Sequence, residues 1–479
     1  MVINVLQVIL VIFVVLMVFN LMIIVHEVGH FLAAKWRGLL VDRFGVWFGK
    51  PIWKKKIGGV TYSLGSIPAG GFVSLPQMLP MEALEGGIEV DGKKLEDLPP
   101  VSPLDKIIVA FAGPLFSMLL AFAFAGIVWL IGKPVDDSEL TTQIGYVLQG
   151  SPAEAAGLMA GDIVKKVDGK PVSRFSSNIN DSITWNVITS SGDTIAFDIL
   201  RNGKPMSLNV APHIGDSKLY ERKKLRSVGI APAEKCIAGE IFPHSPADRA
   251  GMQVLDQVIA VDDQPVYHRS AVSDYIEANR EKALKLTILR QGKRYDFTVK
   301  AELPLQGSER PLVGIYWEPL RWDRLEHIAP WKQITSSLLA MKSTLGAIFS
   351  KRVDVGPQHL SGPVGIMNLY YLLFMTDDGW RMALWFSVLL NVNLAVLNLL
   401  PFPVLDGGHI TMAILEAIRK KPFNIKALEI LQSACAFALI GFMLYVTFFD
   451  VQDVANIQSG NESQEKSVPI IFSPEAGNP

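Results

Sequence analysis

The chain has 479 residues, which is enough for several domains, and 49% of them are hydrophobic. This content and a mean hydropathy of +0.29 are high for a soluble protein and favour several membrane spans. The net charge of −1 provides no basic surface for nucleic acid, so we expect no nucleic-acid partner. The two cysteines have no Cys-x-x-Cys spacing, which excludes a cysteine-based zinc site.

Four uncharged stretches are long enough to cross a bilayer, which takes about 20 residues. They are residues 1–25 (continuing toward 34), 107–132, 382–405 and 430–449. The first stretch has no basic residue before its apolar run and no small-residue cleavage site, so it is interpreted as a retained span rather than a signal peptide.

Lysines and arginines predict the orientation of the spans. They follow the first span, over residues 35–56, and they gather between the third and fourth spans, over residues 419–426. Short loops rich in these residues stay in the cytoplasm. Both ends of the chain and residues 133–380 are therefore expected on the outer side.

The sequence His26-Glu27-Val28-Gly29-His30 stands at the end of the first apolar stretch. On a helix, His26 and His30 lie one turn apart on the same face and can bind one zinc ion. Glu27 is beside them, where a carboxylate can accept a proton from water, as in His-Glu-x-x-His metalloproteases. Three ionisable groups in an apolar helix need a common partner, so we prefer this interpretation to two buried core histidines.

The outer segment contains an internal repeat. Residues 151–157 recur as residues 245–251, both with the pattern Ser-Pro-Ala-x-x-Ala-Gly, and the similarity continues to residues 172 and 266. The pattern resembles bacterial PDZ domains, which bind an extended chain end at a sheet edge. Asp262-Asp263 in the second copy replaces the Asp-Gly turn of the first, and aspartate is less favourable than glycine at positive φ. Peptide binding and a spacer or size-filter role both remain open.

A catalytic zinc usually has three protein ligands and one open position. The third stretch ends in a segment where Pro401 and Pro403 interrupt the helix, and Asp406 follows at the membrane edge. The first and third spans both end on the cytoplasmic side, so Asp406 can meet the two histidines at one depth. His409 is the competing ligand and ranks below Asp406, which is next to the helix break.

Together these features resemble the site-2 protease family of intramembrane zinc proteases. That family combines His-Glu-x-x-His with Asn-x-x-Pro-x-Pro-x-Leu-Asp-Gly, and the second motif matches here from Asn398 to Gly407. The resemblance includes the tandem PDZ insert and residues 65–73 and 359–366, and so covers nearly the whole chain. It departs at Ser117, where the family has asparagine, and Ser117 is assigned no functional role.

The resemblance implies an α-helical polytopic membrane protein. It would have four transmembrane helices, a site-2 protease core, the tandem β-rich PDZ insert and a membrane-associated β-hairpin. Zn²⁺ would be held by His26, His30 and Asp406, with Glu27 as the catalytic base. Expected substrates are single-span proteins already trimmed on the periplasmic side, among them an anti-sigma factor and remnant signal peptides, in the bacterial inner membrane.

Two other functions compete with this one. One is a catalytically inactive membrane PDZ scaffold. It is less favoured, because such a scaffold would not need His26, Glu27, His30 and Asp406 all to be intact. A membrane-anchored quality-control protease acting outside the membrane conflicts with the expected depth and cytoplasmic bias of the zinc motif.

Two regions are expected to bind substrate. Asn398 is an amide in an apolar helix and is suited to bond a substrate backbone or a developing oxyanion, with Pro401 and Pro403 beside it. An interhelical hydrogen bond is the alternative, and Asn391 and Asn393 are weaker candidates.

The second region is residues 59–75, predicted as a β-hairpin that turns back at residues 68–71. Its open edge, with Gly70 and Gly71, would pair with an unwound substrate. An ordinary cytoplasmic hairpin is the alternative. Residues 331–350 are predicted to form a helix lying on the outer membrane surface.

The expected order along the chain can be given by residue ranges. It is a zinc-motif helix at 1–34, a cytoplasmic loop with the hairpin at 35–103, a second span at 104–132, PDZ domains at 133–220 and 221–310, an amphipathic juxtamembrane segment at 311–378, a third span at 379–406, a cytoplasmic loop at 407–429, a fourth span at 430–449 and a periplasmic tail at 450–479.

Overall fold

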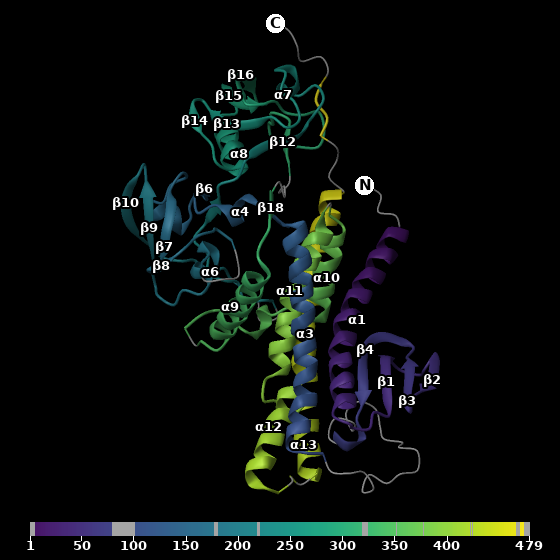
Figure 1. Cartoon of the computed structure of the whole chain (residues 1–479). Helices are drawn as coiled ribbons and strands as arrows, with labels where there is room; N and C mark the ends of the chain where they lie inside the picture. Colours follow the sequence, from purple (N-terminus) through teal and green to yellow (C-terminus); the bar gives the residue numbers. More distant parts are fainter. Residues whose placement is uncertain are drawn as a thin grey trace. The chain divides into compact units, whose positions relative to one another are not determined.

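A computed structural model describes residues 5–465 and 470–473, apart from residues 79–100, 177–180, 218–220, 319–323, 351, 377, 422 and 424. The chain forms two compact units, coloured along the sequence in Figure 1. The helical unit comprises residues 1–133, 326–341 and 361–451. The insert unit comprises residues 134–325, 342–360 and 452–479.

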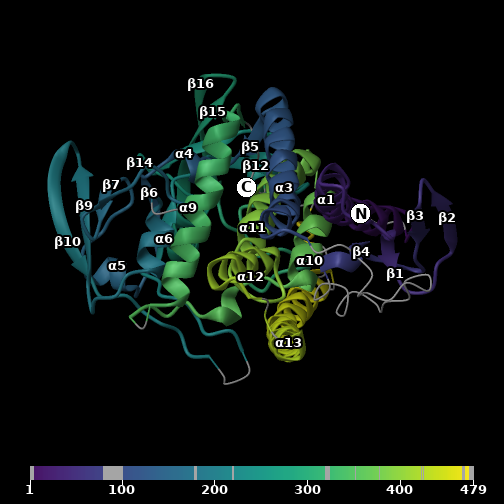
Figure 2. The same ribbon diagram turned by 60° about the horizontal axis from the view of Figure 1, so that its bottom comes forward.

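Four helices among the described residues are long and apolar enough to cross a membrane. They are α1 (Val5–Trp36), α3 (Pro103–Ile131), α11 (Gly379–Asn398) and α13 (Ile425–Glu465). They match the four predicted spans, and the chain is a polytopic membrane protein with a β-rich insert. Within the helical unit, α3 packs against both α1 and α11 (Figure 1, Figure 2).

The start of α3 follows from its sequence. The Ser102 hydroxyl accepts a hydrogen bond from the Asp105 amide at 3.1 Å, and proline occupies the first helical turn. These are typical N-terminal signals of a helix.

Shorter helices connect the spans. The helical unit contains α10 (Pro363–Phe374) and α12 (Asp406–Arg419), and α9 (Pro330–Ile348) begins in it. The predicted loop at 407–429 thus contains most of α12. The helix predicted at 331–350 is present as α9, and its Ile334 packs with apolar residues of α3 and α11. The Gln333 amide donates to the Ala125 carbonyl of α3 at 3.0 Å.

The hairpin predicted at residues 59–75 is wrong. The four strands after α1 are β1 (Arg43–Phe48), β2 (Trp53–Ile57), β3 (Val60–Leu64) and β4 (Ile67–Ser74), in the order β2-β3-β1-β4. The hairpin is formed by β2 and β3, because Gly58 and Gly59 adopt the positive φ values that a tight turn requires. Residues 68–71 continue strand β4, which pairs with β1 at an edge of the sheet.

The insert unit contains two related β-rich domains, described here as the first and second insert domains. The first has strands β6 (Ile144–Val147), β7 (Ile163–Val167), β8 (Lys170–Pro171), β9 (Ile195–Arg201), β10 (Lys204–Val210) and β11 (Ile230–Pro232), with helices α4 (Asp137–Leu140), α5 (Pro152–Ala155) and α6 (Ile183–Ile188). The second has β12 (Cys236–Ile241), β13 (Gln257–Val261), β14 (Gln264–Pro265), β15 (Ala283–Arg290), β16 (Lys293–Lys300) and β17 (Ile315–Trp317), with α7 (Pro246–Arg249) and α8 (Arg269–Ala278). Strands β5 (Lys133–Val135) and β18 (Arg324–Glu326) form a further two-stranded sheet.

The repeated residues have matching structural roles in the two insert domains. Ser151 and Ser245 each cap the short helix that follows them. The buried carboxylates of the repeat also match. Asp162 binds Arg201, and Asp256 binds Arg290, each through two nitrogen–oxygen contacts of 2.6 to 2.7 Å. Asp263 in the second copy has a φ of 61°, the left-handed conformation expected from its turn position.

The predicted C-terminal boundaries of the two insert domains, at residues 220 and 310, lie before the last strand of each domain. Strand β11 lies beyond residue 220, yet it pairs with β6 of the first domain. Likewise β17 lies beyond residue 310 and pairs with β12 of the second domain. Each domain is completed by a strand that returns to its first strand, so the domains extend to residues 232 and 317. Such nonlocal pairing leaves no local signal in the repeat.

Candidate metal centre

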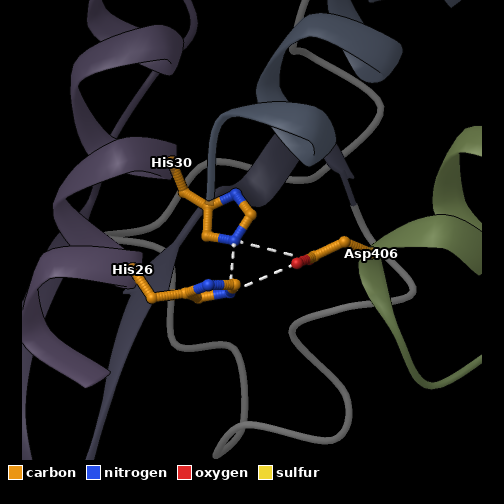
Figure 3. Close-up of side chains that lie close together, drawn as sticks. All are labelled: His26, His30 and Asp406. Atoms are coloured by element: carbon orange, nitrogen blue, oxygen red, sulfur yellow. Dashed lines mark hydrogen bonds and ion pairs between the residues drawn. The ribbon is translucent and has the colours of Figure 1, made fainter. Parts of the chain in front are cut away.

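Three side chains from two distant parts of the sequence converge in the helical unit. His26 and His30 lie one turn apart on α1, and Asp406 is the first residue of α12 (Figure 3). The Nε2 atoms of His26 and His30 lie 3.2 and 3.4 Å from the Asp406 carboxylate. All three residues are buried, and one ligand atom from each lies within 4.8 Å of the others.

The hydrogen bonds of the histidines favour a cation between them. The Nδ1 atom of His30 lies 2.8 Å from the Val109 carbonyl, which can only accept, so Nδ1 carries the proton and Nε2 has a free lone pair in neutral imidazole. That lone pair lies 3.2 Å from Nε2 of His26. Asp406 Oδ2 is buried without a hydrogen bond. Two imidazole nitrogens and a carboxylate are a donor set that fits zinc.

Helix α3 supports both histidines at positions four residues apart. Val109 accepts from His30, and the Ser117 hydroxyl lies 3.0 Å from Nδ1 of His26. Gly113 lies between them, where a Cβ atom would be 2.2 Å from His30 Nε2. Ser117, to which the sequence assigned no functional role, thus lies against one of the two histidines. Small residues spaced by four in an apolar helix are a signal of close helix packing that would have indicated this face.

Glu27 and Asn398 line the same cavity as the three converging residues. Its volume is about 230 Å³, and its other lining residues are Ile23, Leu394, Val404 and Leu405. The backbone amide of Val73 in β4 donates to the Glu27 carboxylate. The cavity can therefore hold a small polar group between a carboxylate, an amide and the converging ligand atoms.

Strand β4 lies beside α1 at this cavity. A Cβ on Gly71 would be 3.4 Å from Cγ of Glu27. Asn20, a residue of α1 that sequence reasoning missed, donates to the Pro68 carbonyl at 3.2 Å. An amide inside an apolar span was the available signal. Gly70 has a φ of 80° and packs against the Phe48 ring.

The sequence matches the model of Peptidase family M50 over residues 13–442. The chain belongs to this family. M50 membership identifies it as a zinc metalloprotease.

Several curated proteins are similar to the chain over most of its length. A putative zinc metalloprotease of Neisseria meningitidis is 28% identical, over 90% of this chain and 97% of that protein. A putative zinc metalloprotease of Treponema pallidum is 26% identical, over 90% and 96%. The regulator of sigma-E protease RseP of Salmonella typhimurium is 26% identical, over 85% and 90%.

Other predicted residues of this M50 protein are not among the converging ligand atoms. His409 is buried, and burial lowers its pKa to about 4, so its imidazole is neutral at physiological pH. It is outside the group of converging ligand atoms found among the described residues. Asn391 donates to the Ser387 carbonyl within α11 at 2.8 Å. Pro403 accepts from Gln432 of α13 at 3.2 Å, so it helps to place the segment between α11 and α12.

Proposed function

We propose that the chain is an intramembrane zinc endopeptidase that cleaves the membrane-spanning segment of single-span proteins. The convergence of His26, His30 and Asp406 carries this proposal, because two of these residues belong to an apolar helix long enough to cross a membrane. Glu27 lines the same cavity, as a catalytic base must. The family gives the peptidase chemistry, and the position of the histidines in an apolar helix supports a site within the membrane.

Each side chain has a distinct role in the proposed mechanism. His26, His30 and Asp406 would hold zinc, which supplies Lewis-acid chemistry and lowers the pKa of water. Glu27 accepts the proton of the attacking water and then delivers it to the leaving amine. The Val73 amide donates to the Glu27 carboxylate and holds it toward the cavity. The Asn398 amide is suited to donate to the oxygen of the cleaved carbonyl.

A substrate helix must unwind before hydrolysis, and its freed backbone groups then need partners in an apolar setting. Strand β4 is suited to provide them, because it is an edge strand and lies beside Glu27. Gly71 keeps this edge open, since it has no side chain toward α1. Pairing of an extended substrate with β4 would bring its backbone to the cavity. Pro401 and Pro403 lie between α11 and α12 and lead into Val404 and Leu405, which line the cavity.

The name of the Salmonella relative supports a substrate class. We infer that substrates include an anti-sigma factor and remnant signal peptides, already trimmed on the periplasmic side, and that the protein acts in the bacterial inner membrane during envelope stress. The chain ends and the insert domains would be periplasmic. The insert domains would be PDZ domains, since the second has a groove of about 320 Å³ between α8 and β17.

Zinc content and turnover test the proposal when measured together. His26→Ala and His30→Ala are expected to lose zinc and cleavage of a single-span reporter in detergent. Glu27→Gln should keep zinc and lose cleavage, because water is still held but its proton has no acceptor. His409→Gln is the matched control, since this buried histidine lies outside the ligand set, and it should keep both. Normal cleavage by Glu27→Gln, or full zinc content in both alanine variants, would refute the assignment.

A further inference from the structure

A short apolar run follows a strongly polar stretch beyond α13. Residues 458–467 contain no hydrophobic residue, whereas residues 468–472 read Val-Pro-Ile-Ile-Phe. An isolated apolar run outside a membrane needs a surface that covers it. The last described residues of the chain, 470–473, lie within the insert unit, and we call them the docked segment.

The docked segment pairs with the loop between β16 and β17 of the second insert domain. The Leu305 amide donates to the Ile471 carbonyl at 2.7 Å, and the Ile471 amide donates to the Gln306 carbonyl at 3.1 Å. This is an antiparallel bridge between an extended segment and a loop. Two backbone hydrogen bonds thus hold the segment to this loop.

Phe472 anchors the docked segment by its side chain. It is 2% exposed, and its ring would lie 3.3 Å from a Cβ placed on Gly314 at the start of the β17 strand. Ile470 lines the groove between α8 and β17, which is otherwise lined by residues such as Ile276, Glu277 and Trp317. The segment therefore forms part of the wall of that groove through Ile470.

The first insert domain provides an internal comparison. Gly229 in that domain faces Ser151 just as Gly314 faces Ser245. After this serine, the residue nearest to a Cβ placed on Gly229 is Leu148 of the same domain. The residue nearest to a Cβ placed on Gly314 is Phe472. The aromatic anchor is thus an addition to the second domain from a distant part of the chain, and not a part of the repeated fold.

We propose that residues 470–473 are a built-in ligand of the second insert domain. Phe472 is its anchor, and Ile470 is part of the wall of the α8–β17 groove, where the segment obstructs other extended chains. An external peptide that binds along this part of the wall must displace the segment. A tethered ligand competes at an effective concentration on the order of millimolar, so weak docking is enough to exclude most free peptides. This regulation is separate from the peptidase chemistry and does not depend on it.

Hydrogen exchange of the full-length protein in detergent tests the docking. The Leu305 amide should be protected in the wild type and should exchange about tenfold faster or more in Phe472→Ala, because the buried ring is lost. Ile471→Ala is the matched control, since that side chain is 44% exposed and its pairing uses the backbone. The amides of Glu302 and Leu312, which pair with each other within the loop, report whether the domain stays folded.

A labelled peptide tests the closure of the groove. The probe is a fluorescein-labelled peptide of residues 466–479, and the receptor is the protein ending at residue 465. The peptide should bind this truncated protein and bind the full-length protein at least about tenfold more weakly, because the latter is occupied by its own segment. The same peptide with Phe472→Ala should not bind.

Two results would overturn the proposal. One is equal Leu305 exchange in the wild type and in Phe472→Ala with Glu302 and Leu312 still protected. The other is peptide binding that is equal for the truncated and full-length proteins, or undetectable with the truncated protein at millimolar concentration. If Phe472→Ala loosens the whole domain, the peptide measurement alone decides.

Discussion

The hydroxyl oxygen of Ser117 lies 3.0 Å from Nδ1 of His26, the nitrogen that faces away from Asp406. The hydroxyl can accept a hydrogen bond from a protonated Nδ1 or donate one to an unprotonated Nδ1, and either bond directs Nε2 at the ligand cluster. Ser117 therefore orients the His26 ring, whereas the Val109 carbonyl, which only accepts, fixes both the orientation and the protonated nitrogen of His30.

Ser117→Ala should weaken zinc binding by about 10- to 100-fold, the usual effect of losing a hydrogen bond to a metal-binding histidine. Zinc release during a chelator titration measures this. Ser387→Ala is a control in another span, because the buried Ser387 hydroxyl bonds the Ala383 carbonyl and the Tyr370 hydroxyl, neither of which belongs to the site. Equal chelator resistance in the wild type and in Ser117→Ala would show that the hydroxyl does not orient His26.

Gly113→Ala should abolish zinc binding and cleavage. The added methyl group would lie 2.2 Å from Nε2 of His30 and 2.8 Å from Cε1 of His26, so the rings or the helix must shift. Gly126→Ala in the same helix is the control, because a Cβ there meets no atom within 4 Å. The readouts are bound zinc and reporter cleavage after purification. An active, zinc-loaded Gly113→Ala protein would contradict the close packing of α3 on the histidines.

Asp450→Ala should destabilise the start of α10. The carboxylate of Asp450 accepts from the amides of Gly362 and Gly365 at 2.9 and 2.8 Å, and it is buried. Leaving buried backbone donors unpaired costs about 1–3 kcal/mol of unfolding free energy. Asp453→Ala removes the ion pair between Arg222 and Asp453, whose side chain is 48% exposed. It should lower the unfolding free energy by less than about 1 kcal/mol. Melting in detergent compares the two, and equal losses would argue against the capping role.

The proposed orientation predicts thiol accessibility in intact cells. With Cys435 replaced by serine, cysteines introduced at Lys54 and Lys420 should be shielded from an impermeant thiol reagent, and one at Asp216 should react. Cys236 adds no background, because burial raises its pKa to about 12. A raised pKa means less thiolate, and at pH 8 only about one thiol in ten thousand is ionised. Labelling at Lys54 but not at Asp216 would show that the chain has the opposite orientation in the membrane.

The insert domains are predicted to obstruct large substrates rather than to take part in hydrolysis. Deletion of residues 142–318 removes both domains with their closing strands, whereas a cut at residue 300 would leave β17 without β12. The deleted protein should still cleave a span with a short outer stub and should also accept one with a large folded outer domain. Loss of short-substrate cleavage by a zinc-loaded protein would place the domains in the catalytic assembly. If the deleted protein still fails to cleave the large substrate, helix α9 rather than the insert domains would exclude large substrates.

Local patterns predicted the spans and the ligand set. His26 and His30 share a face because of helical spacing, and Asp406 follows a proline-rich interruption of an apolar stretch. The strand order of the sheet after α1 could not be predicted in this way. Strand β1 lies between β3 and β4, and no short sequence pattern encodes that pairing. The hydrogen bond between Ser117 and His26 likewise depends on how α3 packs against α1. Asp450 was predicted only as the first residue of a periplasmic tail, since its role requires α10 to be beside it.

The position of Asp406 on a different helix from the histidines has a consequence for assembly. A cation held by all three side chains is a cross-link between the beginning and the end of the sequence. Ligand binding to the folded state adds to its stability, by about 2.7 kcal/mol at a hundred times the dissociation constant. A newly inserted chain without metal would therefore be both inactive and loosely assembled. Zinc binding would therefore stabilise the fold and activate the protease in a single step.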